Sequence, residues 1–397
     1  MNENRALVSV KRIDAIEPLR VKSGEPARSE LVRIGGWRAT AAVGEFQVGQ
    51  LVVFAEPDSV FPVEERWSFL ERKHYRIETQ KYNNILTQAG EPTISQGLVL
   101  PMDVLPKGTY EEGQDVTKLL GVTHAPEPDD VDEFEANAEF STSNKRPAKF
   151  KWLPKGMFNR LMRHEWFRKL ALPKKEPKGF VQEVSKTDEE RIQNCGKIVN
   201  ADTTWTLTEK VDGQSGTYRL RKVKGGFLKR LFGKPQYDFA VCSRNNRLNK
   251  PDNSSHWAMA KKYKIEEVLK KLLNTPMFKG FDWIAIQGEV AGPKIQKNRQ
   301  GLTENHLYVF NLITPKGRVK SMEARVYVGN LGLEWVPIIS YGVDLHGKTE
   351  QDLLEMANGM SLLNPERMRE GIVFRAENPD LDLSFKAVSP EYELKNK

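Results

Sequence analysis

Lys210-Val211-Asp212-Gly213 is the stretch of this 397-residue chain from which its fold and chemistry can be interpreted. A lysine that attacks phosphorus forms a phosphoramidate, and this bond stays reactive enough to pass a bound nucleotide on. The order of the residues that follow predicts Lys210 as such a nucleophile. An acidic turn, an aromatic strand, a second Glu-Gly turn and another lysine come at Gly288-Glu289, 307–310, Glu370-Gly371 and Lys386.

Lys210 would be an ammonium ion at neutral pH, because the pKa of a free lysine side chain is near 10.4. Nearby cations or burial would have to lower that pKa before the amine could attack. A divalent metal ion and Lys386 are the candidates, and both would also neutralise the phosphates under attack. Asp212 and Gly213 fit a tight turn that brings the backbone close to a nucleotide.

The composition is that of a globular protein with two or more domains, since 397 residues exceed one usual core. No apolar run approaches the roughly 20 residues that cross a membrane, and the N-terminus has no signal-peptide core. Two cysteines, Cys195 and Cys242, argue against a disulfide framework and a cysteine-based zinc site. A reducing compartment, the cytoplasm, is therefore expected.

The net charge of +8 is concentrated in one part of the chain. Residues 126–140 contain seven acids and no Lys or Arg, whereas residues 145–180 contain twelve Lys and Arg and two Glu. A nucleic acid is the expected partner of this basic segment, because bound cations neutralise phosphates and release counterions. The alternative is a solvated surface helix whose apolar side is buried.

Two domains and a linker are predicted from the pattern of apolar residues. Residues 1–120 contain short strand-like runs separated by Gly, Pro and Asp, which fit an OB-like β-barrel, although other small β-folds fit them too. Residues 121–180 form the charge-segregated linker or insertion. Residues 181–397 alternate strand and helix signals, as in an α+β domain. Strands are expected at 283–286, 307–310 and 371–374, and one amphipathic helix is expected at 257–273.

Residues 208–213, Thr-Glu-Lys-Val-Asp-Gly, resemble the first motif of the ATP-dependent polynucleotide ligase and capping-enzyme superfamily. The tetrapeptide alone is weak, because about one chain in ten of this length contains it by chance. The longer stretch 287–298, Gln-Gly-Glu-Val-Ala-Gly-Pro-Lys-Ile-Gln-Lys-Asn, is similar to the second signature of the RNA ligase 2-like enzymes. Shorter similarities follow the family's order at 242–245, 308–311, 370–373 and 384–386.

The resemblance implies a role for each matching residue. Lys210 would carry AMP, Glu209 would border the adenine, and Phe310 rather than Tyr308 would stack on the base. Glu289 would contact the ribose. The other implied nucleotide-binding residues are Asp212, Gly213, Arg244, which would reach the nucleotide or the RNA end, and Lys386, which would contact the α-phosphate.

Glu370 would help to coordinate Mg²⁺ or Mn²⁺ in the same family pattern. The last motif departs from that pattern, because Ser384 stands where the first of two paired lysines is expected. One phosphate contact of the family is therefore without its usual residue.

The order of the domains resembles the family-5 RNA ligases, in which an OB domain precedes the catalytic core. Eleven residues after Lys386 leave no room for the OB domain that most polynucleotide ligases carry there. Residues 35–37 and 48–54 are also similar to the family-5 N-terminal domain. The expected architecture is an N-terminal OB-like β-barrel and a C-terminal α+β adenylyltransferase domain of the ATP-grasp-like ligase type.

These resemblances predict an ATP-dependent RNA ligase that seals nicks with RNA on the 3′-hydroxyl side. Lys210 would be adenylated, AMP would move to a 5′-phosphate, and the 3′-hydroxyl would then expel AMP. The expected partners are ATP, Mg²⁺ or Mn²⁺ and a nicked duplex, with the duplex on the N-terminal domain and the nucleotide within residues 181–397.

A DNA ligase on the same core is the alternative enzyme. A nucleic-acid-binding protein with a degenerate catalytic domain is the alternative of another class, although the intact Lys210, Glu289, Glu370 and Lys386 argue against it. A phosphate-loop ATPase is disfavoured, because the pattern GxxxxGK[ST] is absent from the sequence.

Overall fold

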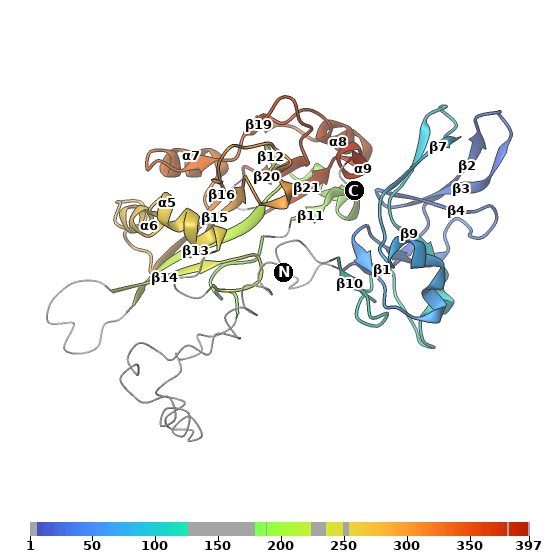
Figure 1. Ribbon diagram of the computed structural model, residues 1–397, viewed down its shortest axis with the longest axis horizontal. Coiled ribbons are helices and arrows are strands. Elements are labelled where there is room, and N and C mark those ends of the chain that lie inside the picture. The colour runs from blue at the N-terminus through green and yellow to red at the C-terminus, as the bar shows by residue number, and fades with distance from the viewer. Residues whose placement is uncertain are drawn as a thin grey trace, which may run out of the picture.

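Strands dominate both halves of the chain, and Figure 1 shows them gathered into two bodies. The computed structural model describes residues 6–125, 179–187, 189–223, 236–248, 254–378 and 381–395. One body contains residues 6–125, and the other contains the described residues from 179 onwards. The linker predicted at residues 121–180 lies outside the described residues except at its two ends.

The N-terminal body contains two antiparallel sheets with the strand orders β1-β5-β9 and β4-β3-β2-β7-β8. A pair of short strands, β6 and β10, and the 3-10 helices η1 and η2 complete it. The bounds are β1 (Val8–Arg12), β2 (Ala15–Val21), β3 (Pro26–Ile34), β4 (Trp37–Ala42), β5 (Leu51–Ala55), β6 (Ser59–Val60), η1 (Glu65–Lys73), β7 (Gln80–Leu86), β8 (Pro92–Ser95), β9 (Leu98–Leu100), η2 (Met102–Val104) and β10 (Thr123–His124).

Strand β5 is apolar throughout because it is buried on both faces. Successive side chains of a strand point to opposite faces. Val53 accordingly packs in one apolar cluster with Val8 and Trp67, whereas Val52 and Phe54 pack in a second cluster that includes Trp37. Each fully buried Val or Phe contributes roughly 1.5–3 kcal/mol of transfer free energy, so β5 is the centre of this body.

The C-terminal body contains a five-stranded sheet, β11-β21-β20-β12-β19, and a six-stranded sheet, β14-β13-β15-β16-β17, with β18 paired to β16. The predicted strands at 283–286, 307–310 and 371–374 are confirmed as parts of β15, β16 and β20. The bounds are β11 (Glu190–Arg191), β12 (Trp205–Lys210), β13 (Gln214–Val223), β14 (Gln236–Cys242), β15 (Trp283–Ala291), β16 (His306–Thr314), β17 (Gly317–Arg318), β18 (Glu334–Trp335), β19 (Ile338–Val343), β20 (Gly371–Ala376) and β21 (Ser384–Val388).

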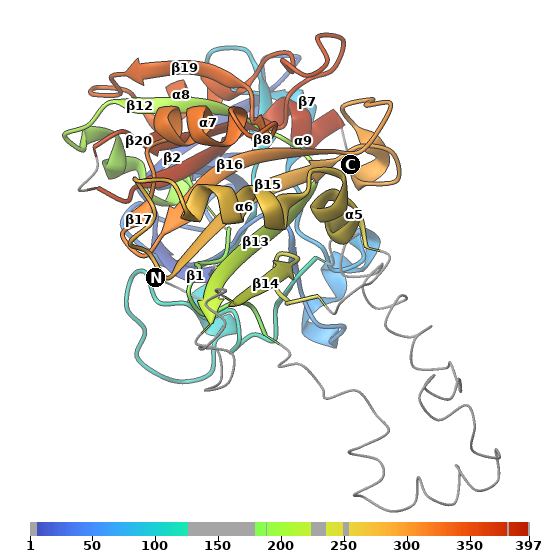
Figure 2. The same cartoon turned by 90° about the vertical axis from the view of Figure 1, so that its left-hand side faces the viewer.

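Helices cover the sheets of this body, and Figure 2 shows α5, α6 and α7 in front of the six-stranded sheet. Helix α8 packs on β20 and β21 of the other sheet. None of the described helices is long and apolar enough to span a bilayer. The bounds are η4 (Ile192–Asn194), η5 (Gly196–Asn200), α5 (Ser255–Lys262), α6 (Ile265–Leu273), η6 (Gln296–Asn298), α7 (Ser321–Gly329), α8 (Glu350–Ala357) and α9 (Pro390–Lys395).

The single helix predicted at 257–273 is wrong, because the chain breaks there into α5 and α6. Lys264 adopts a left-handed backbone conformation with φ of 49°. The preceding Tyr263 donates its hydroxyl hydrogen to Glu334 at 2.6 Å, which anchors the break to β18. No Gly or Pro marks this position, so the sequence pattern continues across it.

Residues 211–213 join β12 of the five-stranded sheet to β13 of the six-stranded sheet. Gly213 is required at this junction, since a Cβ atom there would lie 2.4 Å from the carbonyl oxygen of Val290. The loop is therefore pressed against β15, and side chains from both sheets converge around it.

Candidate active site

A pocket of about 480 Å³ lies where the 211–213 loop joins the two sheets. Strands β12, β15, β16 and β21 and the start of β20 all contribute side chains to it. The structure brings together every site residue predicted from the sequence: Glu209, Lys210, Asp212, Gly213, Arg244, Glu289, Phe310, Glu370 and Lys386.

Strand register explains how residues so distant in sequence meet. Lys210 at the end of β12 pairs with Gly371, the neighbour of Glu370, in β20. Lys386 of β21 pairs with Val373, two residues further along β20, and therefore lies on the same face of the sheet. The adjacent sheet contributes Glu289, which pairs with Ser215 just after the loop.

Lys210 lies among acids. Its Nζ is 2.6 Å from Oε1 of Glu370, and a quarter of the side chain is exposed. Burial lowers the pKa of Lys210, but the carboxylates of Glu370, Glu289 and Asp212 raise it more, so the pKa stays above its usual value. The amine is an ammonium ion in this arrangement, and a cation bound by the same acids would be needed to make it a nucleophile.

Glu370 can supply one ligand to such a cation. Its Oε2 is buried and has no hydrogen-bond partner among the described residues, while burial raises the pKa of this carboxyl despite the lowering effect of Lys210. The described residues contain no group of three or more His, Cys, Asp or Glu side chains that could coordinate a metal. Mg²⁺ commonly takes one or two carboxylates together with substrate phosphates and waters, and the unpaired oxygen of Glu370 fits that pattern.

Glu209 is bound on both carboxylate oxygens. One accepts a hydrogen bond from the Ser361 hydroxyl and the other accepts one from the backbone N–H of Leu362 at 2.7 Å. Burial raises the pKa of Glu209 although these donors lower it. Glu209 therefore ties β12 to the 361–362 segment while it lines the pocket, and its place beside an adenine stays a prediction.

Phe310 lines the pocket, whereas Tyr308 on the same strand is 4% exposed and stacks on His306. The ring of Phe310 lies 5.4 Å from the guanidinium carbon of Arg375. A cation is attracted to the electron-rich face of an aromatic ring. This position fits the choice of Phe310 over Tyr308 as the residue available to a base.

Arg375 is a pocket residue that the sequence analysis missed. It is 5% exposed, its Nη1 donates to Oγ1 of Thr208 at 3.0 Å, and its Nη2 lies 3.4 Å from Oε1 of Glu189. Its Nε has no hydrogen-bond partner among the described residues. Burial lowers the pKa of Arg375 to about 10, opposed by Glu189, so this is a buried cation that lacks full compensation.

Ser384, the residue that departs from the family pattern, pairs directly with Arg375 across β20 and β21. Its hydroxyl donates to Glu189, the same carboxylate that faces Arg375. Directly opposed side chains on one sheet face have Cβ atoms roughly 4.5–5.5 Å apart. A cation is thus present next to the position where the lysine is missing. The signal in the sequence was a charged residue within an apolar strand. Arg375 alternates with Ile372 and Phe374, which lie in the core, and so points to the same face of β20 as Val373.

The N-terminal body also lines this pocket, through Pro57, Asp58, Arg76, Glu78, Thr79, His124 and Ala125. The predicted nucleotide-binding residues all lie within residues 181–397, and the N-terminal body adds lining residues that the sequence analysis did not include. Close contacts between the two bodies account for these added residues: Trp37 donates from Nε1 to Asn194 at 2.8 Å, and a Cβ atom on Gly36 would lie 2.7 Å from the Cα of Gln193. Local sequence patterns carry no signal for such contacts.

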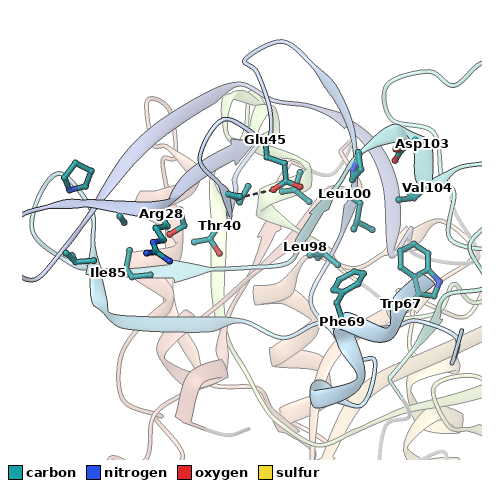
Figure 3. A pocket seen from close by; sticks show the side chains of 18 of the residues that line it. Arg28, Thr40, Glu45, Trp67, Phe69, Ile85, Leu98, Leu100, Asp103 and Val104 are labelled. Carbon is teal, nitrogen blue, oxygen red and sulfur yellow. Dashed lines mark hydrogen bonds between the residues drawn. The ribbon is translucent and has the colours of Figure 1, made fainter. Parts of the chain in front are cut away.

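A larger cleft of about 1180 Å³ lies within the N-terminal body, between β3, β4, β7, β9 and η1 (Figure 3). Phe69 and Trp67 form one wall, and Arg28 and Glu45 lie opposite. Its charged lining residues are mixed in sign: Arg28, Arg66, Glu25, Glu45 and Asp103. Despite its size, it lacks the lysine and carboxylate arrangement of the smaller pocket, so the smaller pocket is the candidate active site.

Comparisons with known proteins agree with this division. Residues 203–388 match the family model for RNA ligase, and residues 7–102 match a model for an OB-fold domain. No curated protein matches the chain.

Solved structures of Naegleria gruberi RNA ligase are similar over nearly the whole chain. The structure with pyrophosphate has a TM-score of 0.71 at 25% identity and covers 99% of both chains. A variant with AMP and Mn has a TM-score of 0.71 at 25% identity and covers 99% of this chain and 100% of that one. A variant with ATP and Mn has a TM-score of 0.70 at 25% identity, with 98% and 99% covered. The predicted OB-fold followed by an α+β ligase domain is confirmed.

Proposed function

We propose that this chain, whose residues 203–388 match the RNA ligase family behind a matching OB-fold domain, joins nucleic-acid ends in three ATP-dependent steps. The observation that carries this proposal is the placement of Lys210 against Glu370 at the floor of a pocket that also contains Glu289, Phe310 and Lys386. The similar Naegleria structures contain ATP, AMP, pyrophosphate and Mn, which supports the same ligands here.

In the first step, Nζ of Lys210 attacks the α-phosphorus of ATP. A phosphorus–nitrogen bond forms, the bond to pyrophosphate breaks, and the lysine proton passes towards Oε1 of Glu370, 2.6 Å away. Mg²⁺ or Mn²⁺, when bound, would neutralise phosphate charge and lower the pKa of Lys210. Oε2 of Glu370, which has no partner among the described residues, is the proposed metal ligand.

Preformed positive charge would stabilise the transition state in this pocket. Lys386 is proposed to contact the α-phosphate. Arg375 is proposed to supply the second cation that Ser384 cannot supply, because it lies directly opposite Ser384 and its Nε lacks a partner among the described residues. Such fixed groups act most strongly in a pocket with little water.

Base and ribose would be bound by the remaining lining residues. We propose that adenine stacks on Phe310 and lies beside Glu209, and that Glu289 contacts the ribose. Asp212 and Gly213 would bring the backbone of the loop to the nucleotide, and Arg244 would reach the nucleotide or the nucleic-acid end. All six line the pocket.

In the later steps, AMP passes from Lys210 to a 5′-phosphate, and a 3′-hydroxyl attacks that phosphate and releases AMP. The substrate is proposed to be a nicked duplex with RNA at the 3′-hydroxyl side, bound across the junction of the two bodies. Arg76 and His124 of the N-terminal body line the same pocket as Lys210. Cys195 and Cys242 are free thiols, which fits the proposed cytoplasmic location.

Sealing of a matched set of nicked duplexes tests this proposal. Four duplexes carry RNA or DNA on the 3′-hydroxyl side and RNA or DNA on the 5′-phosphate side. We expect fast sealing only where the 3′-hydroxyl end is RNA. Equal sealing of the all-DNA nick would favour the DNA ligase alternative, and absence of sealing on all four by a protein that binds them would favour the degenerate binding protein.

A further inference from the structure

Helix α9 (Pro390–Lys395) lies between the N-terminal body and the strands of the active site (Figure 1). We propose that Tyr392 and Glu393 of this helix are positioning residues that couple docking of the N-terminal body to the Lys210 loop. The proposal rests on the function proposed above. Both residues lie beyond residues 203–388, the part of the chain that matches the RNA ligase family.

Tyr392 holds the carboxylate of Asp212, two residues from Lys210. Its hydroxyl donates to Oδ2 of Asp212 at 2.6 Å, and Arg299 donates to the same oxygen at 3.0 Å. The guanidinium of Arg299 also lies 5.8 Å from the centre of the Tyr392 ring. Short hydrogen bonds to a carboxylate are about twice as strong as neutral ones. Because Tyr392 and Asp212 are 6% and 8% exposed, water does not readily replace this contact.

Ser389, the residue before this helix, is bound to the backbone of Glu370, the acid that pairs with Lys210. The backbone N–H of Ser389 donates to the carbonyl oxygen of Glu370 at 2.9 Å, and the Ser389 hydroxyl donates to Asn358 at 2.6 Å. The backbone N–H of Tyr392 in turn donates to the Ser389 hydroxyl at 3.1 Å. Helix α9 and the residue before it thereby contact both acids next to Lys210, Asp212 through the side chain of Tyr392 and Glu370 through the backbone of Ser389.

Glu393, the next residue, faces the N-terminal body. Its Oε1 lies 2.8 Å from Nη1 of Arg191, and its Oε2 accepts a hydrogen bond from the Thr79 hydroxyl at 2.7 Å. Arg191 is nearly buried and also lies 3.7 Å from Asp58 of the N-terminal body. Separation of the two bodies would leave these charges with fewer partners, which is costly in a buried setting.

A chain of contacts therefore runs from Thr79 through Glu393 and Tyr392 to Asp212. If it positions the loop, weakening either end should slow the attack of Lys210 on ATP without much change in ATP binding. A helix that only braces the fold would change stability and leave the rate constant of the folded protein unaltered. The chemical step and the apparent ATP affinity must therefore be measured separately.

The test is single-turnover adenylation of the full chain by ATP and Mg²⁺, with the rate constant at saturating ATP and the half-saturating ATP concentration measured for each variant. We expect Tyr392→Phe to lower the rate constant about 10-fold, the scale of one hydrogen bond to a charged group, with the half-saturating concentration changed less than about 2-fold. Thr79→Val, in the other body, should lower the rate constant about 3-fold or more, because it removes a neutral donor to Glu393.

The double variant Thr79→Val/Tyr392→Phe decides between coupling and independent roles. If both residues act through Asp212, the double variant should be no slower than Tyr392→Phe alone, because residues in one network are not additive. Multiplied effects, or wild-type rate constants in both single variants, would overturn the proposal. Tyr218→Phe is the matched control, and it should react at the wild-type rate. It removes a buried tyrosine hydrogen bond, 3.2 Å long, to the backbone oxygen of His256, and neither residue lines the pocket.

Failure of the proposed function has a different outcome in the same assay. A wild-type chain that forms no adenylate would overturn the proposed function and this inference together. A wild-type chain that forms the adenylate at the same rate as all variants would overturn only the role of α9. Thermal unfolding of each variant shows that the compared proteins are folded at the assay temperature.

Discussion

Replacement of Arg375 by alanine tests whether this buried cation supplies the phosphate contact that Ser384 lacks. The change removes the hydrogen bond to Thr208 at 3.0 Å and the contact with Glu189 at 3.4 Å. It also leaves the carboxylate of Glu189 with one cation fewer in a buried part of the pocket. Both stability and catalysis are expected to suffer, so the two effects have to be separated.

The expected loss in catalysis follows from the geometry. Arg375 is 5% exposed and its position is fixed by β20, so it needs no rearrangement to face developing charge. Removal of one preorganised donor of this kind costs about 100-fold to 1000-fold in rate, or roughly 3–4 kcal/mol. We expect Arg375→Ala to slow adenylation of Lys210 by about that factor, and Arg375→Lys to slow it less because the charge remains.

A second substitution makes the test specific. Ser384→Lys restores the residue of the family pattern directly opposite position 375. In the Arg375→Ala background it should recover at least about 10-fold of the lost adenylation rate, since an ammonium ion regains part of the electrostatic effect. Adenylation is followed by transfer of labelled AMP to the protein, and Ser384→Ala in the same background is the matched control.

The reasoning about Arg375 would be refuted by either of two results. Folded Arg375→Ala protein could adenylate at the wild-type rate, in which case Arg375 serves the fold alone. Alternatively, Ser384→Lys and Ser384→Ala could give the same rate in the Arg375→Ala background, in which case the two positions do not share a function. Thermal unfolding of each protein identifies variants that fail only because they are unfolded.

Two further predictions concern the lysine pair and the base. Glu370→Gln should lower the pKa of Lys210, because Glu370 contributes the largest of the charges that raise it. Adenylation should nevertheless fall by at least about 100-fold, because the proposed metal ligand and proton acceptor is lost. A faster reaction at low pH would show that Glu370 only keeps Lys210 protonated. Phe310→Ala should raise the half-saturating ATP concentration by about 10-fold, the scale of one base-stacking contact. Phe239→Ala is the control, because Phe239 belongs to a core cluster and does not line the pocket. An unchanged dependence on ATP concentration would remove Phe310 from the base site.

The sequence was most informative where chemistry restricts residue type. Lys210, Glu289 and Glu370 were identified from motifs, and the structure places all three at one pocket. This was possible because each lies at or near the end of a strand, so motif order and strand alternation together restrict where its side chain can be. The OB-fold was predicted from short strand runs, which also fitted other small β-folds, together with the resemblance to the family-5 RNA ligases, and it is confirmed by the match at residues 7–102.

The sequence was least informative about contacts between distant segments. Tyr392 and Asp212 are 180 positions apart, and Thr79 and Glu393 are 314 apart, so no local period or composition connects them. The break at Lys264 was missed for a different reason, since a lysine with positive φ has no local signal comparable to glycine. Tertiary packing decided these features.

The most direct test of the central claim is the mass of the protein after incubation with ATP and Mg²⁺ in the absence of nucleic acid. The account predicts one covalently attached AMP per chain, located on Lys210 by peptide mapping, with ATP preferred over GTP. Lys210→Ala protein should gain no mass. An adenylate on folded Lys210→Ala protein, an adenylate mapped to another lysine, or preferential labelling by GTP would contradict the account.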